Sequence, residues 1–381
     1  MEYRWIRDAE GFRALRKEWD DAILASGEDN PFLLSDFILT WWKHYSRDYK
    51  ALEVFVVYEG GKIVCGLPLC RDKSGYLEYP GRIDANYTEF LLAKKDSFSW
   101  NIFFDALKEL NGWRCIRLRR YRKSRIEKAG LNLPSSRYDN ILVDAYISEC
   151  AYLINIPEDF SDYLKRLPKK LRYYLRRSEQ EFSKLGSVSL HSLKGCDGLG
   201  KLCDIHINLS RNAFRMRNKK SVFEDETHEM FFRELMRKFC EAGYLDANVL
   251  KLDDRIIAIH FGFSTGNNLN YILPTFDMDF ARLNPGHLLI YKLVELGSKR
   301  KNKLLDLYTG RSLYKEQWSD YREDVVSLEI RPDCLRGRID RAIARQVRML
   351  SIAEKAKKVF APYPLLMDMG RRLKEAVRNY V

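Results

Sequence analysis

A carboxylate interrupts an otherwise apolar stretch in the last third of the chain. Asp306 stands among Leu304, Leu305 and Leu307, in a run that is predicted to be a β-strand. An unpaired carboxylate is costly to bury, so Asp306 favours a base or an anchor for a substrate amine. Lys315 follows shortly after and can pair with Asp306 or hold an anionic acceptor. Both side chains are therefore candidates for chemistry.

A second candidate site lies at the predicted start of a helix. Pro285 and Gly286 open a run whose apolar residues recur at helical spacing. The first N–H groups of a helix have no partner within it and suit an anion. Because Pro285 brings no donor, we expect the amides of Gly286, His287, Leu288 and Leu289 to face a phosphate. The sequence therefore predicts a phosphorylated ligand.

Strands and a helix surround these residues in a regular order. Three runs rich in β-branched and aromatic residues precede the helix, at 247–252, 255–264 and 269–274, and predict an antiparallel meander. Gly297 is expected to end the helix, and the run 304–308 is predicted to be another strand. The order strand, loop, helix, strand would place the helix start against the sheet.

The first part of the chain repeats this pattern. Its predicted elements are two strands, a helix and a third strand, at 52–58, 62–69, 100–110 and 114–118. The stretch 61–65 aligns with 254–258 at the second hairpin, which indicates two copies of one α/β unit. The first copy has Asp84 to Thr88 where the second has Arg282 to His287, so we expect only the second copy to keep the phosphate site.

Length, charge and cysteine content limit the possible classes. The 381 residues suit two units of about 150 to 200 residues each, and we expect boundaries at 1–150, 151–335 and a tail at 336–381. The net charge of +13 indicates an anionic partner without identifying it. The eight cysteines lack metal-ligand spacing, so no metal site is expected, and reduced thiols in a cytoplasmic protein are predicted. No signal peptide or membrane span is recognised.

Basic residues crowd a predicted helix between the two units. The helix spans 164–186, and its polar side carries Lys165, Arg166, Lys169, Lys170, Arg172, Arg176 and Arg177. A solvated face is the simple interpretation, but so many like charges also favour a nearby anion. Arg172 and Arg176, one helical turn apart, are the best candidates for a phosphate or carboxylate.

The C-terminal tail combines basic and apolar residues at helical spacing. The basic members are Arg338, Arg341, Arg345, Arg348, Lys355, Lys357 and Lys358, and the apolar members are Ile339, Ile343, Val347, Leu350 and Ile352. This predicts one or two basic amphipathic helices that pack against the second unit. Peripheral contact with an anionic membrane is the alternative, although Asp340 and Glu354 interrupt the charge.

A set of short motifs, in order along nearly the whole chain, resembles a known family. They are Asn30-Pro31-Phe32, Trp41-Trp42, Gly66-Leu67-Pro68-Leu69, Leu171-Arg172, Arg176-Arg177, Phe276-Asp277, Ala281-Arg282, Pro285-Gly286, Asp306 with Gly310, and Tyr314-Lys315 with Trp318. The sequence resembles the cellulose-biosynthesis (CelD/BcsL) acetyltransferases of the Gcn5-related N-acetyltransferase (GNAT) superfamily. The resemblance implies an α/β fold with two tandem GNAT-like mixed sheets, in which acyl-CoA enters where neighbouring strands splay apart.

The resemblance also assigns roles to residues. It implies that acetyl-CoA or another acyl-CoA is held by a pyrophosphate loop at Arg282, Asn284, Gly286, His287 and Leu288, although Pro285 and His287 replace the loop's usual small residues. Tyr314 resembles the general acid that protonates the departing thiolate, with Asp306 and Lys315 beside it. Arg172, Arg176 and Asp277 would contact the acceptor, an amine or hydroxyl of a sugar or of a lipid- or nucleotide-linked surface-polysaccharide precursor.

Two other functions remain open. The tandem architecture also resembles Fem-type transferases, which take amino acids from aminoacyl-tRNA, and a net charge of +13 suits binding to tRNA phosphates. A non-catalytic basic accessory protein would keep the basic helix and tail but would not need Asp306, Tyr314 and the Pro285-Gly286 helix start together.

Overall fold

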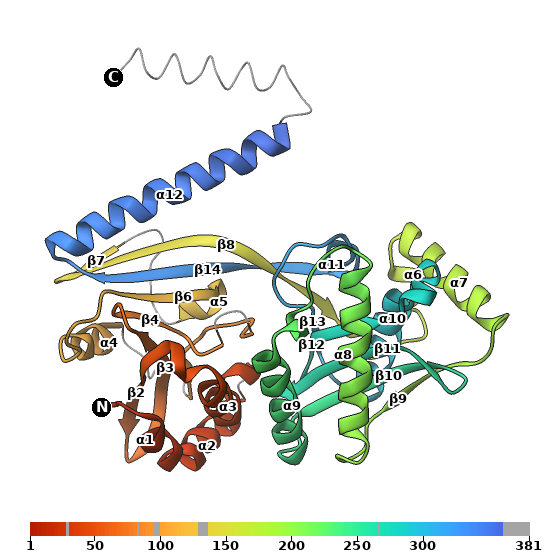
Figure 1. Ribbon diagram of the computed structural model, residues 1–381, viewed down its shortest axis with the longest axis horizontal. Coiled ribbons are helices and arrows are strands. Elements are labelled where there is room, and N and C mark those ends of the chain that lie inside the picture. Colours follow the sequence, from red (N-terminus) through yellow and green to blue (C-terminus); the bar gives the residue numbers. More distant parts are fainter. Residues whose placement is uncertain (28–29, 82–83, 94–99, 129–135, 266, 361–381) are drawn as a thin grey trace.

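The computed structural model describes residues 1–27, 30–81, 84–93, 100–128, 136–265 and 267–360. These residues form one continuous mixed sheet of 14 strands, with helices packed along it (Figure 1). The strands of the first half are β1 (Glu2–Ile6), β2 (Tyr49–Glu59), β3 (Lys62–Asp72), β4 (Tyr76–Glu78), β5 (Leu91–Leu92), β6 (Cys115–Arg122), β7 (Ser136–Tyr138) and β8 (Ile141–Asn155). Those of the second half are β9 (Val188–Ser192), β10 (Leu245–Leu252), β11 (Arg255–Thr265), β12 (Asn268–Phe276), β13 (Leu304–Asp306) and β14 (Tyr321–Pro332).

Helices follow the apolar periodicity of the sequence. In the first half they are α1 (Ala9–Ala14), α2 (Arg16–Ser26), η1 (Pro31–Leu33), α3 (Ser35–Tyr45), η2 (Ser46–Asp48), α4 (Trp100–Leu107) and α5 (Lys123–Lys128). In the second half they are α6 (Tyr163–Arg166), α7 (Lys169–Ser183), α8 (Leu199–Arg215), η3 (Val222–Glu224), α9 (Glu226–Glu241), η4 (Met278–Leu283), α10 (Pro285–Lys299), α11 (Leu313–Trp318) and α12 (Leu335–Phe360). None of the helices in the described ranges is long and apolar enough to cross a membrane.

The predicted repeat is confirmed by the strand order. The strand order is β1-β2-β3-β4-β6-β14-β8-β13-β12-β11-β10-β9. Counted inward from β1 or from β9, the strands follow one another in the same arrangement, so each half of the sheet is one copy of the unit. The two halves exchange their last strands, because β14 pairs with β6 of the first half and β8 pairs with β13 of the second. β8 and β14 also pair with each other in antiparallel register from Ile141 opposite Pro332 to Leu153 opposite Tyr321. The expected boundary after residue 150 therefore falls inside β8.

The predicted meander and helix are confirmed, with a change at the helix end. β10, β11 and β12 are antiparallel neighbours, and α10 follows them. Gly297 does not end α10, which continues to Lys299. A Cβ atom at Gly297 would lie 2.6 Å from Ile156 Cδ1 and 3.0 Å from Leu269 Cδ1, so this glycine lets the helix lie close against the sheet.

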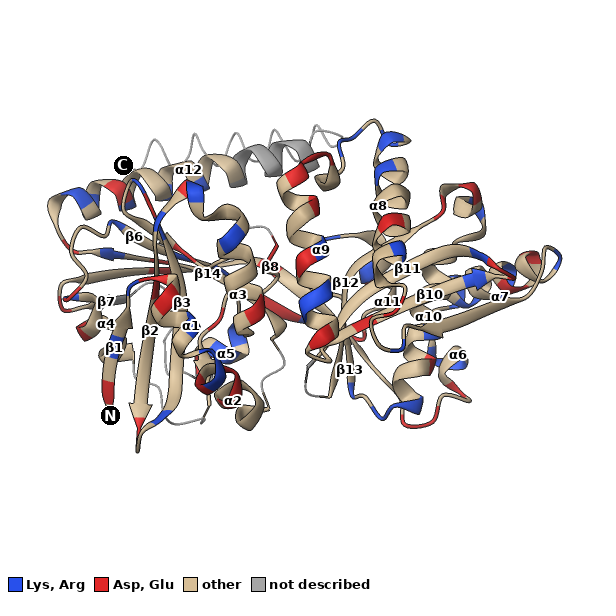
Figure 2. Cartoon of the chain, turned by 60° about the horizontal axis from the view of Figure 1, so that its bottom comes forward, with Lys and Arg blue, Asp and Glu red and all other residues tan. Residues whose placement is uncertain are grey.

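The helices α3 and α9 join the two halves (Figures 1 and 2). Phe37 of α3 and Phe231 of α9 pack edge to face with ring centroids 6.2 Å apart. At the rim of this contact, Lys43 Nζ lies 2.7 Å and His44 Nε2 lies 2.8 Å from the carboxylate of Glu234. The hydrophobic core of the first half thus continues into α8 and α9 of the second.

Two expectations about the chain are corrected by the structure. Cys196 and Cys240 form a disulfide with Cα atoms 5.8 Å apart, because the fold brings the segment before α8 next to the end of α9. The expectation of reduced thiols is wrong for this pair, and disulfides persist mainly outside reducing compartments. The tail helix α12 lies along β14 and β8 and pairs with Arg114, which precedes β6, so it packs on the strands exchanged between the halves and not on the second unit alone.

Candidate active site

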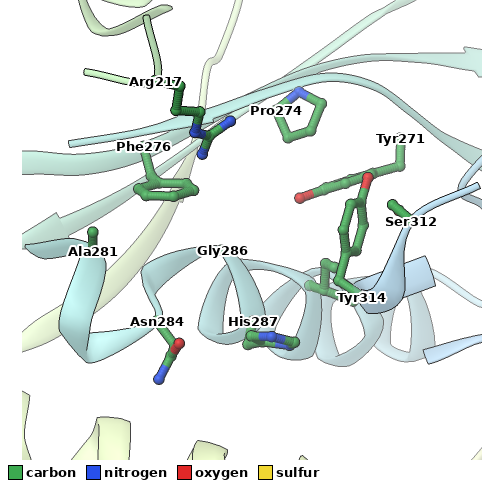
Figure 3. A pocket seen from close by; sticks show the side chains of 11 residues that line it. Arg217, Tyr271, Pro274, Phe276, Ala281, Asn284, Gly286, His287, Ser312 and Tyr314 are labelled. Atoms are coloured by element: carbon green, nitrogen blue, oxygen red, sulfur yellow. The ribbon is translucent and has the colours of Figure 1, made fainter. Parts of the chain in front are cut away.

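The sheet of the second half opens between β12 and β13. These parallel strands pair only from Asn268 opposite Leu304 to Asn270 opposite Asp306. β12 then continues along β11 to Phe276, whereas β13 ends. A cavity of about 510 Å³ lies at the opening, and Figure 3 shows its walls. It is lined by Arg217, Tyr271, Pro274, Phe276, Ala281, Asn284, Gly286, His287, Ile290, Ser312 and Tyr314.

The N-terminus of α10 forms one wall of this cavity (Figure 3). Asn284 takes a left-handed conformation, with φ 55° and ψ 50°, and turns the chain from η4 into α10. Its carbonyl oxygen accepts from the amides of His287 at 3.1 Å and of Leu288 at 3.3 Å. Pro285 has no N–H, so Gly286 is the first residue of α10 with a backbone donor outside this pattern.

Leu288 does not line the cavity. Its amide is used inside the helix and its side chain is buried, as is that of Leu289, because both residues belong to the core-facing side of α10. Arg282 is exposed at the end of η4 and does not line the cavity. Of the loop predicted to hold the donor, the structure brings Asn284, Gly286 and His287 to the cavity.

A hydrogen bond from Trp318 fixes the tautomer of His287. The indole N–H of Trp318 donates to His287 Nδ1 at 2.8 Å. Because an indole nitrogen can only donate, Nδ1 must be the accepting nitrogen and Nε2 carries the proton. Burial lowers the pKa of His287, which keeps the ring neutral at pH 7. His287 thus offers an N–H donor to a ligand in the cavity and is unsuited to act as a base through Nε2.

Arg217 brings a positive charge to the cavity and was not singled out from the sequence. It follows α8 and reaches over Phe276 on the wall opposite α10 (Figure 3). Among the described residues it is the cavity-lining side chain with a formal charge at neutral pH. No local pattern marks this arginine, because only the path of the chain from α8 to α9 places it over β12.

Two tyrosines face each other at the inner end of the cavity. Tyr314 of α11 and Tyr271 of β12 both line it (Figure 3). Burial raises the pKa of Tyr314 to about 12, and it raises the pKa of Tyr271 well above its usual value. Both hydroxyls stay protonated near pH 7, so Tyr314 can donate a proton to a leaving group.

Asp306 lies between the two halves and not on the cavity wall. Its Oδ2 accepts from the Tyr87 hydroxyl of the first half at 2.9 Å, and its Oδ1 accepts from the amide of Tyr308 at 2.7 Å. Tyr308 has a φ of 58° and its hydroxyl donates to Asn270 Oδ1 at 2.8 Å. The buried carboxylate thus ties the end of β13 to the first half and holds the turn that leads to α11.

Lys315 also points away from the cavity wall. Its Nζ donates to the carbonyl oxygens of Thr309 and, at 3.5 Å, Tyr308. Burial lowers the pKa of Lys315 to about 8, although the nearby Asp306 opposes this shift. Lys315 therefore fixes the same turn as Asp306.

The residues predicted to bind the acceptor are not brought together. The carboxylate of Asp277 accepts from the amide of Asp279 at 3.0 Å and pairs with Arg255 at 2.6 Å, so it caps η4. Arg172 donates to the carbonyl of Lys165 at 2.8 Å and fastens α6 to α7. Arg176 is exposed on α7 and does not line the cavity.

The corresponding opening in the first half is filled by the chain itself. β4 and β6 pair over three residues, as β12 and β13 do, from Tyr76 opposite Cys115 to Glu78 opposite Arg117. Beyond them, the amide of Thr88 donates to the carbonyl of Arg120 at 3.4 Å.

A buried ion pair holds in place the segment around Thr88 that fills the opening in the first half. Glu89, which is fully buried, accepts from Arg122 Nε and Nη2, both at 2.7 Å. Arg122 also lies 4.6 Å from the ring centroid of Tyr87. The first half therefore has a plugged opening where the second half has a cavity.

The comparison with protein families defines the class of this domain. A family model described as an acetyltransferase (GNAT) domain matches residues 169–316, which include every residue that lines the cavity. Residues 169–316 therefore match an acetyltransferase (GNAT) domain, which indicates an enzyme. A search of curated proteins finds no match. The narrower resemblance to the cellulose-biosynthesis type stays a prediction.

Solved structures share the overall fold. A crystal structure of FemX has a TM-score of 0.62 at 11% identity, and the match covers 90% of this chain and 100% of that chain. The structure of L-PGS from Bacillus licheniformis has a TM-score of 0.51 at 10% identity, covering 83% of this chain and 91% of that chain. At these identities the likeness concerns the fold and its tandem arrangement.

Proposed function

We propose that the protein transfers an acetyl or longer acyl group from acyl-CoA to an amine or hydroxyl of a sugar or surface-polysaccharide precursor. The observation that carries this proposal is the cavity between β12 and β13, which has an anion-binding helix start on one side and Tyr314 at its inner end. The GNAT match over residues 169–316 supports acyl-CoA as the donor.

Different residues of the cavity would bind different parts of acyl-CoA. The Gly286 amide, the Nε2–H of His287 and the guanidinium of Arg217 are the donors available to the pyrophosphate of the bound acyl-CoA. The apolar wall of Pro274, Phe276 and Ile290 suits the chain that leads from the phosphates to the thioester. The thioester would then reach Tyr314.

The chemistry needs one bond to form and one to break. The acceptor nitrogen or oxygen attacks the thioester carbonyl, the C–S bond breaks, and Tyr314 gives its proton to the departing thiolate. The acceptor loses its own proton to solvent. Asp306 and Lys315 are proposed as positioning residues, because they hold the turn before α11 and thereby the place of Tyr314.

Titration of acyl-CoA together with a turnover assay tests this proposal. We expect wild type to bind acetyl-CoA or a longer acyl-CoA in isothermal titration calorimetry. Tyr314→Phe should bind it equally well but lose turnover by about 10²-fold or more, because only proton donation is removed. Tyr173→Phe is the matched control, since Tyr173 is 59% exposed on α7. If the wild-type protein bound no acyl-CoA, the proposal would be refuted.

A Fem-type aminoacyl transfer is the second candidate. It is favoured by the basic side of α7, where Lys169, Lys170, Arg176 and Arg177 are exposed. Tyr174 of this helix contacts His287, with ring centroids 6.1 Å apart. Under this alternative, charged tRNA should bind in a filter assay in preference to unrelated RNA, and Arg176→Glu should weaken it.

A further inference from the structure

The tail helix α12 is attached to the protein through its charged side. Arg341 and Arg345 both bind the carboxylate of Asp144, at 2.9 Å and 2.6 Å, and Arg348 binds Glu329 at 2.8 Å. Asp340 adds an ion pair at 3.0 Å with Arg114, the residue that precedes β6. These contacts fix the side of α12 that faces the sheet, so its rotation about its own axis is defined.

The opposite side of α12 is apolar and open to solvent. Its exposed members are Leu335 (78%), Ile339 (51%), Ile343 (55%), Val347 (58%), Met349 (69%) and Leu350 (60%). We call these six residues the outer stripe. Figure 1 shows α12 at the outside of the molecule, beyond β14 and β8. Exposed apolar side chains that recur along one side of a helix indicate a binding partner, whereas scattered exposed residues would not.

This arrangement differs from the expectation that the amphipathic tail packs against the second unit. Instead, carboxylates on β8 and β14 attract the arginines inward and turn the outer stripe outward. The side chains beyond Ser351 lie outside the described residues, so the contribution of Ile352, Lys355, Lys357 and Lys358 stays a prediction.

Cations border the outer stripe. Arg338 and Arg345 have side chains 61% and 50% exposed, although each also pairs with a carboxylate. Arg336 is exposed at the start of the helix. An apolar stripe with arginines at its edge is the pattern of a helix that lies in the interface of an anionic membrane.

The same features disfavour a second copy of this chain as the partner. A stable protein interface uses about 20 to 30 residues on each side, and the outer stripe offers six. Two copies would also bring equal basic charges together, because the sequence 335–360 holds eight Lys and Arg against two Asp and Glu. An anionic lipid surface meets both the apolar and the cationic parts.

We propose that α12 docks the protein on an anionic lipid bilayer, with the outer stripe in the interface and the bordering Arg336, Arg338 and Arg345 at the headgroups. The preformed ion pairs hold the helix in the docking orientation before it meets the membrane. The proposal does not depend on the acyltransferase reaction, and its test needs no activity.

Vesicle flotation of the full chain tests this docking. We expect binding to vesicles of phosphatidylcholine with phosphatidylglycerol and at least tenfold weaker binding to pure phosphatidylcholine. The triple variant Ile339→Asn, Ile343→Asn and Val347→Asn should lose at least tenfold of the binding. Leu24→Asn with Met230→Asn is the matched control, because these residues are 61% and 60% exposed elsewhere.

Each of three results would overturn the docking proposal. Wild type could fail to bind anionic vesicles, or it could bind both vesicle types equally. The triple variant could also bind as wild type does while its thermal unfolding is unchanged. Light scattering adds a check on the partner, since a wild-type dimer that the triple variant loses would assign the outer stripe to a second copy.

Discussion

Gly286→Asp should abolish most of the affinity for acyl-CoA without harming the fold. A Cβ atom at Gly286 would lie 3.6 Å from Phe276 Cδ1 and 3.7 Å from Phe276 Cε1, which are ordinary van der Waals distances. The new carboxylate would therefore fit at the cavity wall. An acidic residue in the first turn of a helix is itself stabilising by about 0.3 to 1 kcal/mol, so the free energy of unfolding should not fall.

The size of the effect follows from the repulsion between charges. Two like unit charges 4 Å apart near a protein surface repel by about 4 kcal/mol, and about 1.4 kcal/mol corresponds to a tenfold change in affinity. Salt and partial exposure reduce this repulsion. We therefore expect the dissociation constant of acetyl-CoA to rise by about 10²-fold or more.

The assay is isothermal titration calorimetry at fixed ionic strength, with thermal unfolding measured in parallel. Gly286→Ala is the control, because it adds the same Cβ atom without the charge and should change the affinity little. If Gly286→Asp bound acetyl-CoA as wild type does, the phosphates would not lie at the start of α10. If Gly286→Ala lost affinity equally, the loss would come from steric hindrance and not from charge repulsion.

Two further predictions concern the contact between the halves and the turn before α11. Tyr87→Phe removes the hydroxyl that binds Asp306, so urea denaturation should show a loss of about 1.5 to 3 kcal/mol in the free energy of unfolding while the acetyl-CoA affinity stays unchanged; a loss of affinity without a loss of stability would contradict the structural role of Asp306. Lys315 has its pKa lowered from 10.5 to about 8, so above pH 8 the folded protein has released a proton that the unfolded chain still holds. The free energy of unfolding of wild type should therefore rise between pH 8 and 10.5 by up to about 3 kcal/mol. Lys315→Met should lack this rise, and equal pH profiles for the two proteins would refute the assignment.

Local patterns in the sequence predict the repeated unit well. The Glu59-Gly60-Gly61 turn and the Asp253-Asp254 turn each join two strands and contain residues that favour turns. The start of α10 at Pro285 is also a local signal. These features depend on neighbouring residues, so one sequence suffices to find them.

The exchange of β8 and β14 could not be predicted in this way. Their pairing joins residues such as Val143 and Ile330, which lie far apart in the sequence, and no local pattern encodes that choice. For the same reason, the sequence alone suggested that Asp306 is a base or an anchor for a substrate amine. Its apolar neighbours mark a buried strand, but the Tyr87 hydroxyl that satisfies it comes from the other half.

The cavity is lined both by residues that the sequence indicates and by one that it does not. Asn284, Gly286, His287 and Tyr314, which the sequence patterns and the family resemblance single out, line the cavity. Arg217 lies there as well because the segment between α8 and α9 passes over β12, which is a property of the tertiary fold.

A crystal structure with bound acetyl-CoA tests the central claim most directly. The account predicts density for the pyrophosphate within hydrogen-bonding distance of the Gly286 amide and His287 Nε2, with the thioester sulfur near the Tyr314 hydroxyl. Density for acetyl-CoA outside the opening between β12 and β13, with this cavity left empty, would contradict it.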